Sequence, residues 1–391
     1  MSATLGAAIA RELGAHDSTE AVSDAAVTDT ARELVREALL AGRSGAFEVT
    51  GIQAFSAGST AMLVARLETA LQFVVKVDTS PAIVDEAHLL TMAASDPALP
   101  VAIRDAFPRV YAVDDTPPVY GYLMEDLSGY STLRDTLREG PSEQAERIIA
   151  ALWTDLLGPA YAATRSTRVM PNAREDYFER AHARLLDAAG AGLLPDPDHP
   201  LRIERGSSTT ECSDGWGAAI DRAIERLAVT APRFGTFVHG DPNPENVLWQ
   251  EKPNGTFSFR LIDPKDWWVG DYLFDVAKVV HYLRVTEPVE ALGIEASLES
   301  GTGFTRIGYD PGGIGRHAAV EAALVAHVGR FATDSERPDD PNWKHRLELA
   351  VAANLLGIVG PRLRAAERDR SPGDRHLALI ALGEGLRILG R

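Results

Sequence analysis

The sequence contains a single cysteine, Cys212, among its 391 residues. One thiol cannot form a disulfide within the chain and leaves no cysteine cluster for zinc or iron–sulfur binding, so a reducing, cytoplasmic location is expected. Long apolar runs are also missing, whereas a membrane helix needs about 20 apolar residues. The longest candidate, Leu349–Gly360, is shorter and is interrupted by Asn354. We therefore expect it to be a core helix.

Basic residues are scarce: the chain has 39 Lys and Arg against 56 Asp and Glu, a formal net charge of −17. Nucleic acids and anionic membranes are bound through dense basic surfaces, so neither is expected as a partner. Lysine is scarcer still, because only five of the 39 basic residues are lysines: Lys76, Lys252, Lys265, Lys278 and Lys344. Since arginine supplies the general surface charge, a lysine inside an apolar strand is a candidate for a role that needs a compact point charge.

Short β-rich runs dominate the first third of the chain after a helical lead-in. The apolar spacing over residues 24–41 is typical of an amphipathic helix, and residues 1–50 are expected to form a helical N-terminal extension. Pro81 opens a second predicted helix that ends before Pro97. The expected strands are 51–55, 61–67, 71–77, 110–113 and 121–124. This order predicts a small antiparallel-sheet lobe over residues 51–126.

The remainder, residues 127–391, is expected to be a larger and mainly helical lobe, which makes the fold class α+β. The predicted helices are 142–157, 175–188, 216–227, 318–330 and 343–360. Two segments, 194–213 and 301–315, are rich in Pro, Asp, Ser or Gly and are expected to be long irregular surface loops.

The strongest chemical pattern is a pair of polar clusters beside apolar runs. His239-Gly240-Asp241 is followed by Asn246, and Asp263 follows the run Arg260–Ile262. Asp241, Asn246 and Asp263 can emerge from neighbouring loops as one carboxylate base and two oxygen ligands for Mg²⁺, which is what phosphoryl transfer requires. The alternative is an Asx-rich turn before a strand.

These motifs resemble those of the aminoglycoside phosphotransferase and choline kinase-like family, which has a two-lobed protein-kinase-like fold. The family's His-Gly-Asp, four residues and Asn match His239 to Asn246, so the resemblance implies Asp241 as catalytic base, Asn246 and Asp263 as metal ligands, and ATP and Mg²⁺ as cofactors. Asp263-Pro264-Lys265 is similar to streptomycin-kinase-like members, whereas the inserted Asp266-Trp267-Trp268 departs from the pattern.

Three features of the N-terminal lobe fit the same family. Lys76, in an apolar strand, would position the nucleotide phosphates with Glu86 of the next helix as its partner. A lysine in an edge strand and a pairing with Asp85 instead are the alternatives. The other candidate nucleotide-binding residues are Gly58, Ser59 and Thr60, in a turn whose backbone N–H groups could approach phosphates, and Glu125 and Leu127, in a segment that resembles the adenine-binding hinge.

Neighbours of the catalytic motif are expected to have structural roles. His239 is interpreted as a histidine that bonds the backbone rather than as an acid or base. Asp271 and Asp275 are expected to brace the catalytic loop. The pair Trp267-Trp268 is assigned to packing in preference to stacking on a sugar.

The sequence thus predicts a kinase that transfers the γ-phosphate of ATP to a hydroxyl of a small molecule. Acidic residues after Asp275 could bind ammonium groups, which favours an aminoglycoside, aminocyclitol or amino sugar: Glu287, Glu290, Asp310, Asp339 and Asp340. Neutral sugars, hydroxylated antibiotics, nucleosides and choline-like alcohols stay open, as does a role in resistance or biosynthesis. A pseudokinase scaffold would lack one of the key residues. A protein kinase would need more room for an activation segment than residues 263–275 allow.

Overall fold

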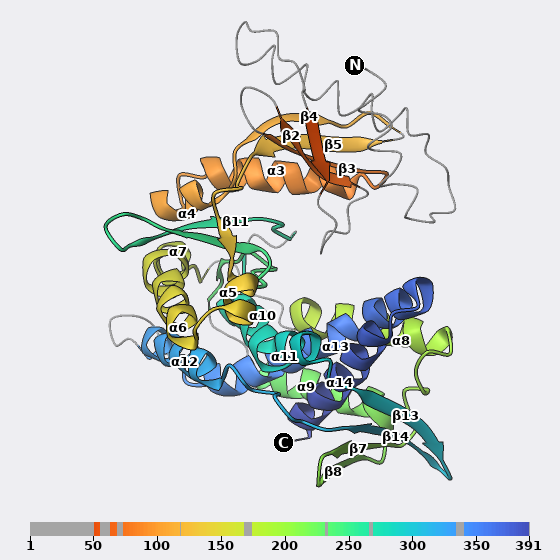
Figure 1. Ribbon diagram of the computed structural model, residues 1–391. Coiled ribbons are helices and arrows are strands. Elements are labelled where there is room, and N and C mark those ends of the chain that lie inside the picture. Colours follow the sequence, from red (N-terminus) through yellow and green to blue (C-terminus); the bar gives the residue numbers. More distant parts are fainter. Residues whose placement is uncertain are drawn as a thin grey trace, which may run out of the picture. The chain divides into compact units, whose positions relative to one another are not determined.

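The computed structural model describes residues 51–54, 63–68, 73–117, 119–167, 174–230, 234–265, 269–333 and 340–390 (Figure 1). The predicted helical extension over residues 1–50 lies outside them. The chain divides into two compact units, Met1–Ser131 with Leu248–Asp266 (unit 1) and Thr132–Val247 with Trp267–Arg391 (unit 2). Residues 248–266 thus belong to unit 1, whereas the sequence-based division assigns them to the helical lobe over residues 127–391.

Unit 1 is built around a five-stranded antiparallel sheet with the order β1-β2-β3-β5-β4. Its strands are β1 (Gly51–Ala54), β2 (Leu63–Glu68), β3 (Phe73–Asp78), β4 (Val110–Asp114) and β5 (Tyr120–Glu125). Helix α3 (Ala82–Ser95) packs on β3, β4 and β5. It begins after Pro81 and ends before Pro97, as predicted, because its apolar residues share one buried face.

The same unit contains a short helix and a second small sheet. Helix α4 (Val101–Ala106) lies against β11 (Phe257–Leu261), which pairs with β10 (Val247–Glu251). The third strand, β6 (Ser131–Thr132), marks the point where the chain passes into unit 2. Asp263 lies two residues after the end of β11, so it belongs to unit 1 together with the β10–β11 hairpin.

Unit 2 is mainly helical around the long helix α13, which packs against α8, α10 and α14 (Figure 1). The helices are α5 (Leu133–Glu139), α6 (Ser142–Ala151), α7 (Gly158–Thr164), α8 (Arg180–Gly190), α9 (Gly215–Thr230), α10 (Tyr272–His281), α11 (Glu287–Leu292), α12 (Ala318–Ala332), α13 (Trp343–Asp369) and α14 (Pro372–Leu389). Three π-helical segments, η1 (Leu152–Leu157), η2 (Arg174–Glu179) and η3 (Tyr282–Thr286), adjoin α6, α8 and α10.

Helix α13 has the length and composition of a membrane span, but most of its apolar window is buried inside the protein. The prediction that Leu349–Gly360 forms a core helix is therefore confirmed. The helix continues past the predicted end at residue 360, with Pro361 inside it. A proline is a weak stop signal here, because Leu363, one turn beyond Val359 and Gly360, is still buried in the core.

Both segments predicted to be irregular loops contain strands, so that prediction is wrong. Strands β7 (Leu201–Arg205), β8 (Ser208–Cys212), β13 (Ala296–Gly301) and β14 (Phe304–Tyr309) form a sheet in the order β13-β14-β7-β8. Alternate residues such as Ile203 and Ile307 point inward and are fully buried. The sheet depends on parallel pairing of β14 with β7, which are far apart in the sequence, so local composition does not reveal it. A two-stranded sheet pairs β9 (Thr236–Phe237), shortly before His239, with β12 (Val269–Gly270).

Candidate functional site

In unit 1 the ammonium of Lys76 lies between two carboxylates. Nζ is 2.8 Å from both carboxylate oxygens of Glu86 and 2.7 Å from Oδ1 of Asp263. Strand β3 supplies the lysine, helix α3 the glutamate, and the end of the β10–β11 hairpin the aspartate. Lys76 is only 5% exposed and its strand lies between β2 and β5. The alternative of an edge-strand lysine is thus excluded, and Glu86 rather than the exposed Asp85 is its partner.

The electrostatics of this cluster keep the lysine charged. Burial alone would lower the pKa of Lys76, but Asp263 and Glu86 together raise it above its ordinary value. Burial and the charge of Asp263 raise the pKa of Glu86, whose Oε1 also accepts a 2.6 Å hydrogen bond from Tyr122. Burial alone would raise the pKa of Asp263, but the charge and hydrogen bond of Lys76, together with smaller contributions from Glu86 and Lys265, lower it. A charged lysine is therefore held beside an ionised aspartate.

Asp263 has an unusual backbone, with φ = 56°. Among the described residues only Arg370 shares a positive φ without being glycine. A non-glycine residue in the left-handed region costs about 1 kcal/mol or more and persists only where its surroundings hold it. The contact with Lys76 is one such constraint, and it fixes the Asp263 carboxylate against the sheet of unit 1.

In unit 2 the motif His239-Gly240-Asp241 is held by a buried carboxylate. Asp275, on α10, accepts hydrogen bonds from the backbone N–H groups of His239 at 2.7 Å and Gly240 at 2.8 Å. Tyr161 donates a third, at 3.0 Å. Burial raises the pKa of Asp275 to about 6, although these hydrogen bonds oppose the rise. The prediction that Asp275 braces the catalytic loop is confirmed.

The conformation of this loop explains two further residues of the motif. Gly240 has φ = 83°, a left-handed conformation that glycine adopts without a steric penalty. His239 is fully buried, and its Nδ1 accepts a hydrogen bond from the backbone N–H of Asp241 at 3.3 Å. It therefore bonds the backbone, which is the structural role that the sequence suggested.

The carboxylate of Asp241 has two polar neighbours that sequence reasoning missed. Its Oδ1 accepts a 2.7 Å hydrogen bond from Nδ2 of Asn243 and lies 3.1 Å from Nζ of Lys278. Asn246 donates from Nδ2 to the backbone oxygen of Asp241 at 2.9 Å, which leaves its amide oxygen as the end able to bind a cation. The position of Lys278, three residues after Asp275 on the same helix, was the available sequence clue.

The predicted metal ligands are Asn246 in unit 2 and Asp263 in unit 1. Both offer oxygen, the donor that Mg²⁺ prefers, and Mg²⁺ commonly takes one or two protein ligands and completes its shell with water and phosphate oxygens. No cluster of three or more His, Cys, Asp or Glu able to hold a metal occurs among the described residues. Each of the two residues by itself therefore offers an oxygen donor of the kind that Mg²⁺ binds.

The structure says little about several of the residues predicted to bind the nucleotide. Gly58, Ser59 and Thr60 lie outside the described residues, as does the Trp267-Trp268 pair. Glu125 ends β5, where its backbone N–H bonds the Arg109 oxygen at 2.9 Å, and Leu127 accepts a bond from Tyr130 at 2.9 Å. Their role at a hinge stays a prediction.

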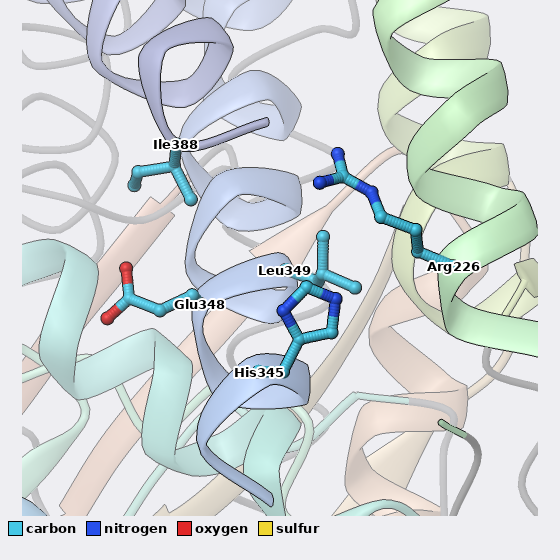
Figure 2. A pocket seen from close by; sticks show the side chains of 5 residues that line it. All are labelled: Arg226, His345, Glu348, Leu349 and Ile388. Carbon is cyan, nitrogen blue, oxygen red and sulfur yellow. The ribbon is translucent and has the colours of Figure 1, made fainter. Parts of the chain in front are cut away.

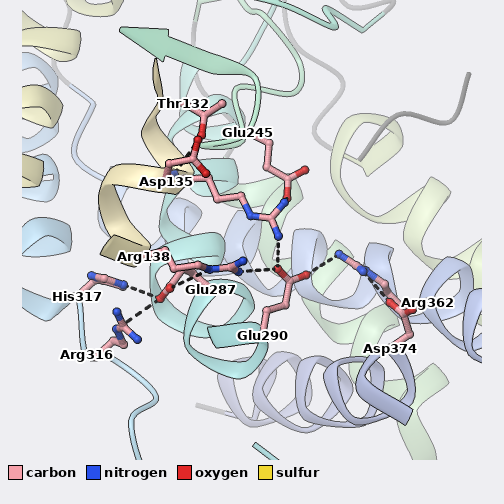
Figure 3. Close-up of polar contacts among 11 residues, drawn as sticks. Thr132, Asp135, Arg138, Glu245, Glu287, Glu290, Arg316, His317, Arg362 and Asp374 are labelled. Atoms are coloured by element: carbon pink, nitrogen blue, oxygen red, sulfur yellow. Dashed lines mark hydrogen bonds and ion pairs between the residues drawn. The ribbon is translucent and has the colours of Figure 1, made fainter. Parts of the chain in front are cut away.

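Most of the acidic residues suggested for binding ammonium groups are already partnered, and Figure 3 shows Glu287 and Glu290 with their partners. Glu290 contacts Arg134, Arg138 and Arg362 at 3.3, 3.4 and 2.9 Å. Glu287 is fully buried, and its Oε2 lies 2.6 Å from His317. Asp340 pairs with Arg346, Asp310 accepts a bond from the backbone of Gly312, and Asp339 lies outside the described residues. Glu287, Glu290 and Asp340 therefore serve the internal structure of unit 2.

Glu245 is the acidic residue of the catalytic loop itself. Its Oε1 accepts a 2.7 Å hydrogen bond from Arg134, which also contacts Glu290. Burial raises the pKa of Glu245, and nearby negative charges that include Asp241 add to the rise. The network of Figure 3 therefore reaches the loop that carries Asp241.

A separate cavity in unit 2 has a volume of about 160 Å³ and lies between α9, α13 and α14 (Figure 2). Its lining residues are Arg226, His345, Glu348, Leu349 and Ile388. None of the predicted site residues lines it, so the cavity is not part of the candidate site.

A buried lysine between two carboxylates on a small antiparallel sheet, and an aspartate in a loop that a following helix fixes, are the parts of a kinase-like phosphoryl-transfer enzyme. The model of the phosphotransferase enzyme family matches residues 51–306, and the chain belongs to this family. The family resemblance and the prediction of a phosphotransferase are confirmed. The similarity of Asp263-Pro264-Lys265 to streptomycin-kinase-like members stays a prediction.

Solved structures of the same fold support the predicted fold class. A thermostable mutant of aminoglycoside phosphotransferase APH(4)-Ia with AMP-PNP and hygromycin B is 15% identical, with a TM-score of 0.50, over 90% of this chain and 97% of that one. Choline kinase LicA from Streptococcus pneumoniae is 13% identical, with a TM-score of 0.50, over 88% and 94%. A Plasmodium vivax ethanolamine kinase is 11% identical, with a TM-score of 0.50, over 85% and 81%. A search of curated protein sequences returns no match.

Proposed function

We propose that this enzyme transfers the γ-phosphate of ATP to a hydroxyl group of a small molecule. The observation that carries the proposal is the Lys76 ammonium, buried between Glu86 and Asp263. Such a cation is costly to bury, and it supplies the charge that a nucleotide phosphate needs. The chain also retains Asp241 and Asn246, so no observation favours the pseudokinase alternative.

In the proposed reaction Asp241 accepts the proton of the acceptor hydroxyl, whose oxygen attacks the γ-phosphorus. The bond from phosphorus to the oxygen that bridges the β- and γ-phosphates breaks, and ADP leaves. Lys76 binds the α- and β-phosphates, and Glu86 keeps the lysine in place. Asn246 and Asp263 would hold Mg²⁺, which supplies positive charge for the phosphate oxygens when bound.

The remaining nucleotide contacts belong to the same proposal. The turn of Gly58, Ser59 and Thr60 would approach the phosphates with its backbone N–H groups, and backbone groups of Glu125 and Leu127 would bind adenine. We propose that the enzyme acts in the cytoplasm, with no nucleic-acid or membrane partner. The net charge of −17 and the single cysteine support this.

For the acceptor we propose an aminoglycoside, aminocyclitol or amino sugar first. The acidic net charge supports a cationic acceptor, as does the shared fold with APH(4)-Ia, which was solved with hygromycin B. The expectation that acidic residues bind ammonium groups is weakened, because three of them are paired with basic side chains: Glu287, Glu290 and Asp340. Glu245 remains as an acidic residue close to Asp241. Neutral sugars, hydroxylated antibiotics, nucleosides and choline-like alcohols are the alternatives.

The test is acceptor-dependent ADP release with ATP and Mg²⁺ across a panel of these acceptor classes. Asp241→Asn removes the base and should lower the rate at least about 100-fold, with ATP binding retained in calorimetry. Asp221→Asn is the matched control, because this exposed aspartate on α9 is not among the proposed site residues or the acids suggested for the acceptor. A rate that Asp241→Asn leaves nearly intact would show that the base is wrongly assigned. ATP binding without acceptor-dependent release across the panel would favour an unlisted acceptor or a scaffold.

A further inference from the structure

Lys278 directs a positive charge at the proposed catalytic base. Its Nζ lies 3.1 Å from Oδ1 of Asp241, and the two side chains are 18% and 15% exposed. The same ammonium lies 5.5 Å from the ring centroid of Phe274. It forms no second ion pair within the described part of the chain. The pair is therefore partly shielded from water, where a charge contact is stronger than on an open surface.

The contacts that fix Asp241 also fix Lys278. Asp275 holds the backbone of the catalytic loop through His239 and Gly240, and Lys278 lies three residues later on α10. Residues three apart on a helix share a face, so Lys278 lies on the same face of α10 as Asp275, whose carboxylate holds the loop. The helix itself begins at a capping aspartate, Asp271, which accepts a bond from the Leu273 N–H at 3.1 Å.

The choice of lysine at this position is informative. Only five of the 39 basic residues are lysines, and one of the others, Lys76, lies at the proposed phosphate site. An ammonium is a compact charge with three donors that can turn from one oxygen to another, whereas a guanidinium is a rigid planar fork. A compact charge suits a position from which one cation must serve both a carboxylate and phosphate oxygens.

The charge balance of the proposed reaction requires a cation beside Asp241. The acceptor hydroxyl bonds to Asp241 as it attacks phosphorus, so the γ-phosphate oxygens come close to the carboxylate. Two negative groups at this separation repel each other unless a positive group lies between them. While Lys278 binds Oδ1 it also occupies a lone pair of the base. An incoming phosphate would draw the ammonium toward its own oxygens.

We propose that Lys278 is a catalytic residue that binds the terminal phosphate of the nucleotide beside Asp241 and neutralises the phosphoryl group during transfer. The proposal rests on the proposed function. The phosphorus–oxygen bond to the acceptor forms as the bond to the bridging oxygen of ADP breaks, and the hydroxyl proton passes to Asp241. Lys278 keeps its proton throughout.

The test compares the binding of ADP and of AMP-PNP, both with Mg²⁺, by calorimetry. Lys278→Met should weaken AMP-PNP binding roughly 10- to 100-fold and change ADP binding less than about threefold, because only AMP-PNP has the terminal phosphate. Lys278→Arg keeps the charge but not the compact ammonium, and it should restore only part of the AMP-PNP affinity. Lys344→Met is the control: this exposed lysine lies over the Trp343 ring at the same 5.5 Å, and its loss should leave both affinities unchanged.

Turnover gives a second readout once an acceptor is found. In Lys278→Met, kcat should fall at least about 10-fold while the KM for the acceptor changes little, because the ammonium would contact the phosphoryl group and not the acceptor. For Lys278→Ala, added methylammonium should raise kcat in a saturable way. A merely structural ion pair would leave the ratio of AMP-PNP to ADP affinity at its wild-type value.

The possible outcomes separate this inference from the proposed function. Normal wild-type binding of both nucleotides with an unchanged ratio in Lys278→Met would overturn the role of Lys278 alone. Equal weakening of ADP and AMP-PNP would also overturn it, because the terminal phosphate would not be the group recognised. A wild-type protein that binds neither nucleotide would overturn the proposed function and this inference together.

Discussion

Arg346, on α13, is fully buried and joins two aspartates in the core of unit 2. Its Nε bonds Asp271, and its two terminal nitrogens contact Asp340 at 2.9 and 2.6 Å. It also donates to the backbone oxygen of Thr230 at 3.0 Å. Asp271 caps α10, the helix that carries Lys278. Arg346 therefore links α10 to the central helix α13.

Replacing Arg346 with methionine keeps an unbranched apolar stem and removes the guanidinium group with its charge and donors. The variant leaves Asp271 and Asp340 buried without their cation, although Tyr177 and Tyr272 still donate to them. Breaking a buried ion pair in this way costs about 3–5 kcal/mol, since the remaining charge is uncompensated. Two carboxylates lose one shared partner, so we expect a loss of about 4 kcal/mol in the free energy of unfolding of unit 2.

Arg364 on the same helix is the matched control. It pairs with Asp187, but the two side chains are 48% and 60% exposed. Arg364→Met should therefore cost less than about 1 kcal/mol. The assay is urea unfolding followed by circular dichroism and tryptophan fluorescence.

A triple variant tests the cause of the loss. Arg346→Met combined with Asp271→Asn and Asp340→Asn removes the uncompensated charges and keeps a good capping residue at position 271. It should recover at least about 2 kcal/mol relative to Arg346→Met alone. The reasoning is refuted if Arg346→Met is no more destabilising than Arg364→Met, or if the triple variant is less stable than the single one.

Two further predictions concern nucleotide binding and pH. Lys76→Met should weaken ATP binding about 10- to 100-fold, because a charged donor to phosphate is lost. The control is Lys252→Met, which changes an exposed lysine of the same unit and should leave ATP binding unchanged. Equal ATP affinities of the two variants in calorimetry would contradict the role of Lys76. Burial lowers the pKa of His281 to about 3, so between that value and about 6.5 the unfolded chain binds a proton that the folded chain does not. Stability therefore falls as the pH drops through this window, and His281→Phe, which lacks this term, should gain about 2 kcal/mol relative to wild type between pH 6 and 4.5 in urea unfolding. A difference that does not change with pH would contradict the buried neutral histidine.

Elements whose packing follows from their own residues were predicted well. The strand of Lys76 and the helix of Glu86 are an apolar run and an apolar stripe, and both occur where the pattern put them. The sheet of β7, β8, β13 and β14 was missed for the opposite reason. Its strands are short, the flanking segments are rich in turn-forming residues, and its central pairing joins Thr305 to Leu201. A contact between such distant residues leaves no local periodicity to detect.

The candidate site divides in the same way. Asp241, Asn246 and Asp263 are recognisable because their motif is contiguous or nearly so. The sequence does not predict whether an acidic residue is available to bind a ligand, because its ion-pair partners come from distant parts of the chain. Glu290, for example, is paired with arginines of α5 and α13. Lys278 was missed because its contact with Asp241 depends on how α10 is rotated relative to the catalytic loop. The sequence does not reveal this rotation.

Each unit holds its part of the proposed machinery with its own contacts. Lys76 and Asp263 meet within unit 1, on the sheet and the hairpin that joins it. Asp241 is fixed within unit 2, by the loop, by α10 and through Arg346 by α13. Electrostatic catalysis needs charges that are in position before the substrate arrives. The structure shows such prepositioned charges within each unit: Lys76 is paired with Asp263 in unit 1, and Lys278 is paired with Asp241 in unit 2.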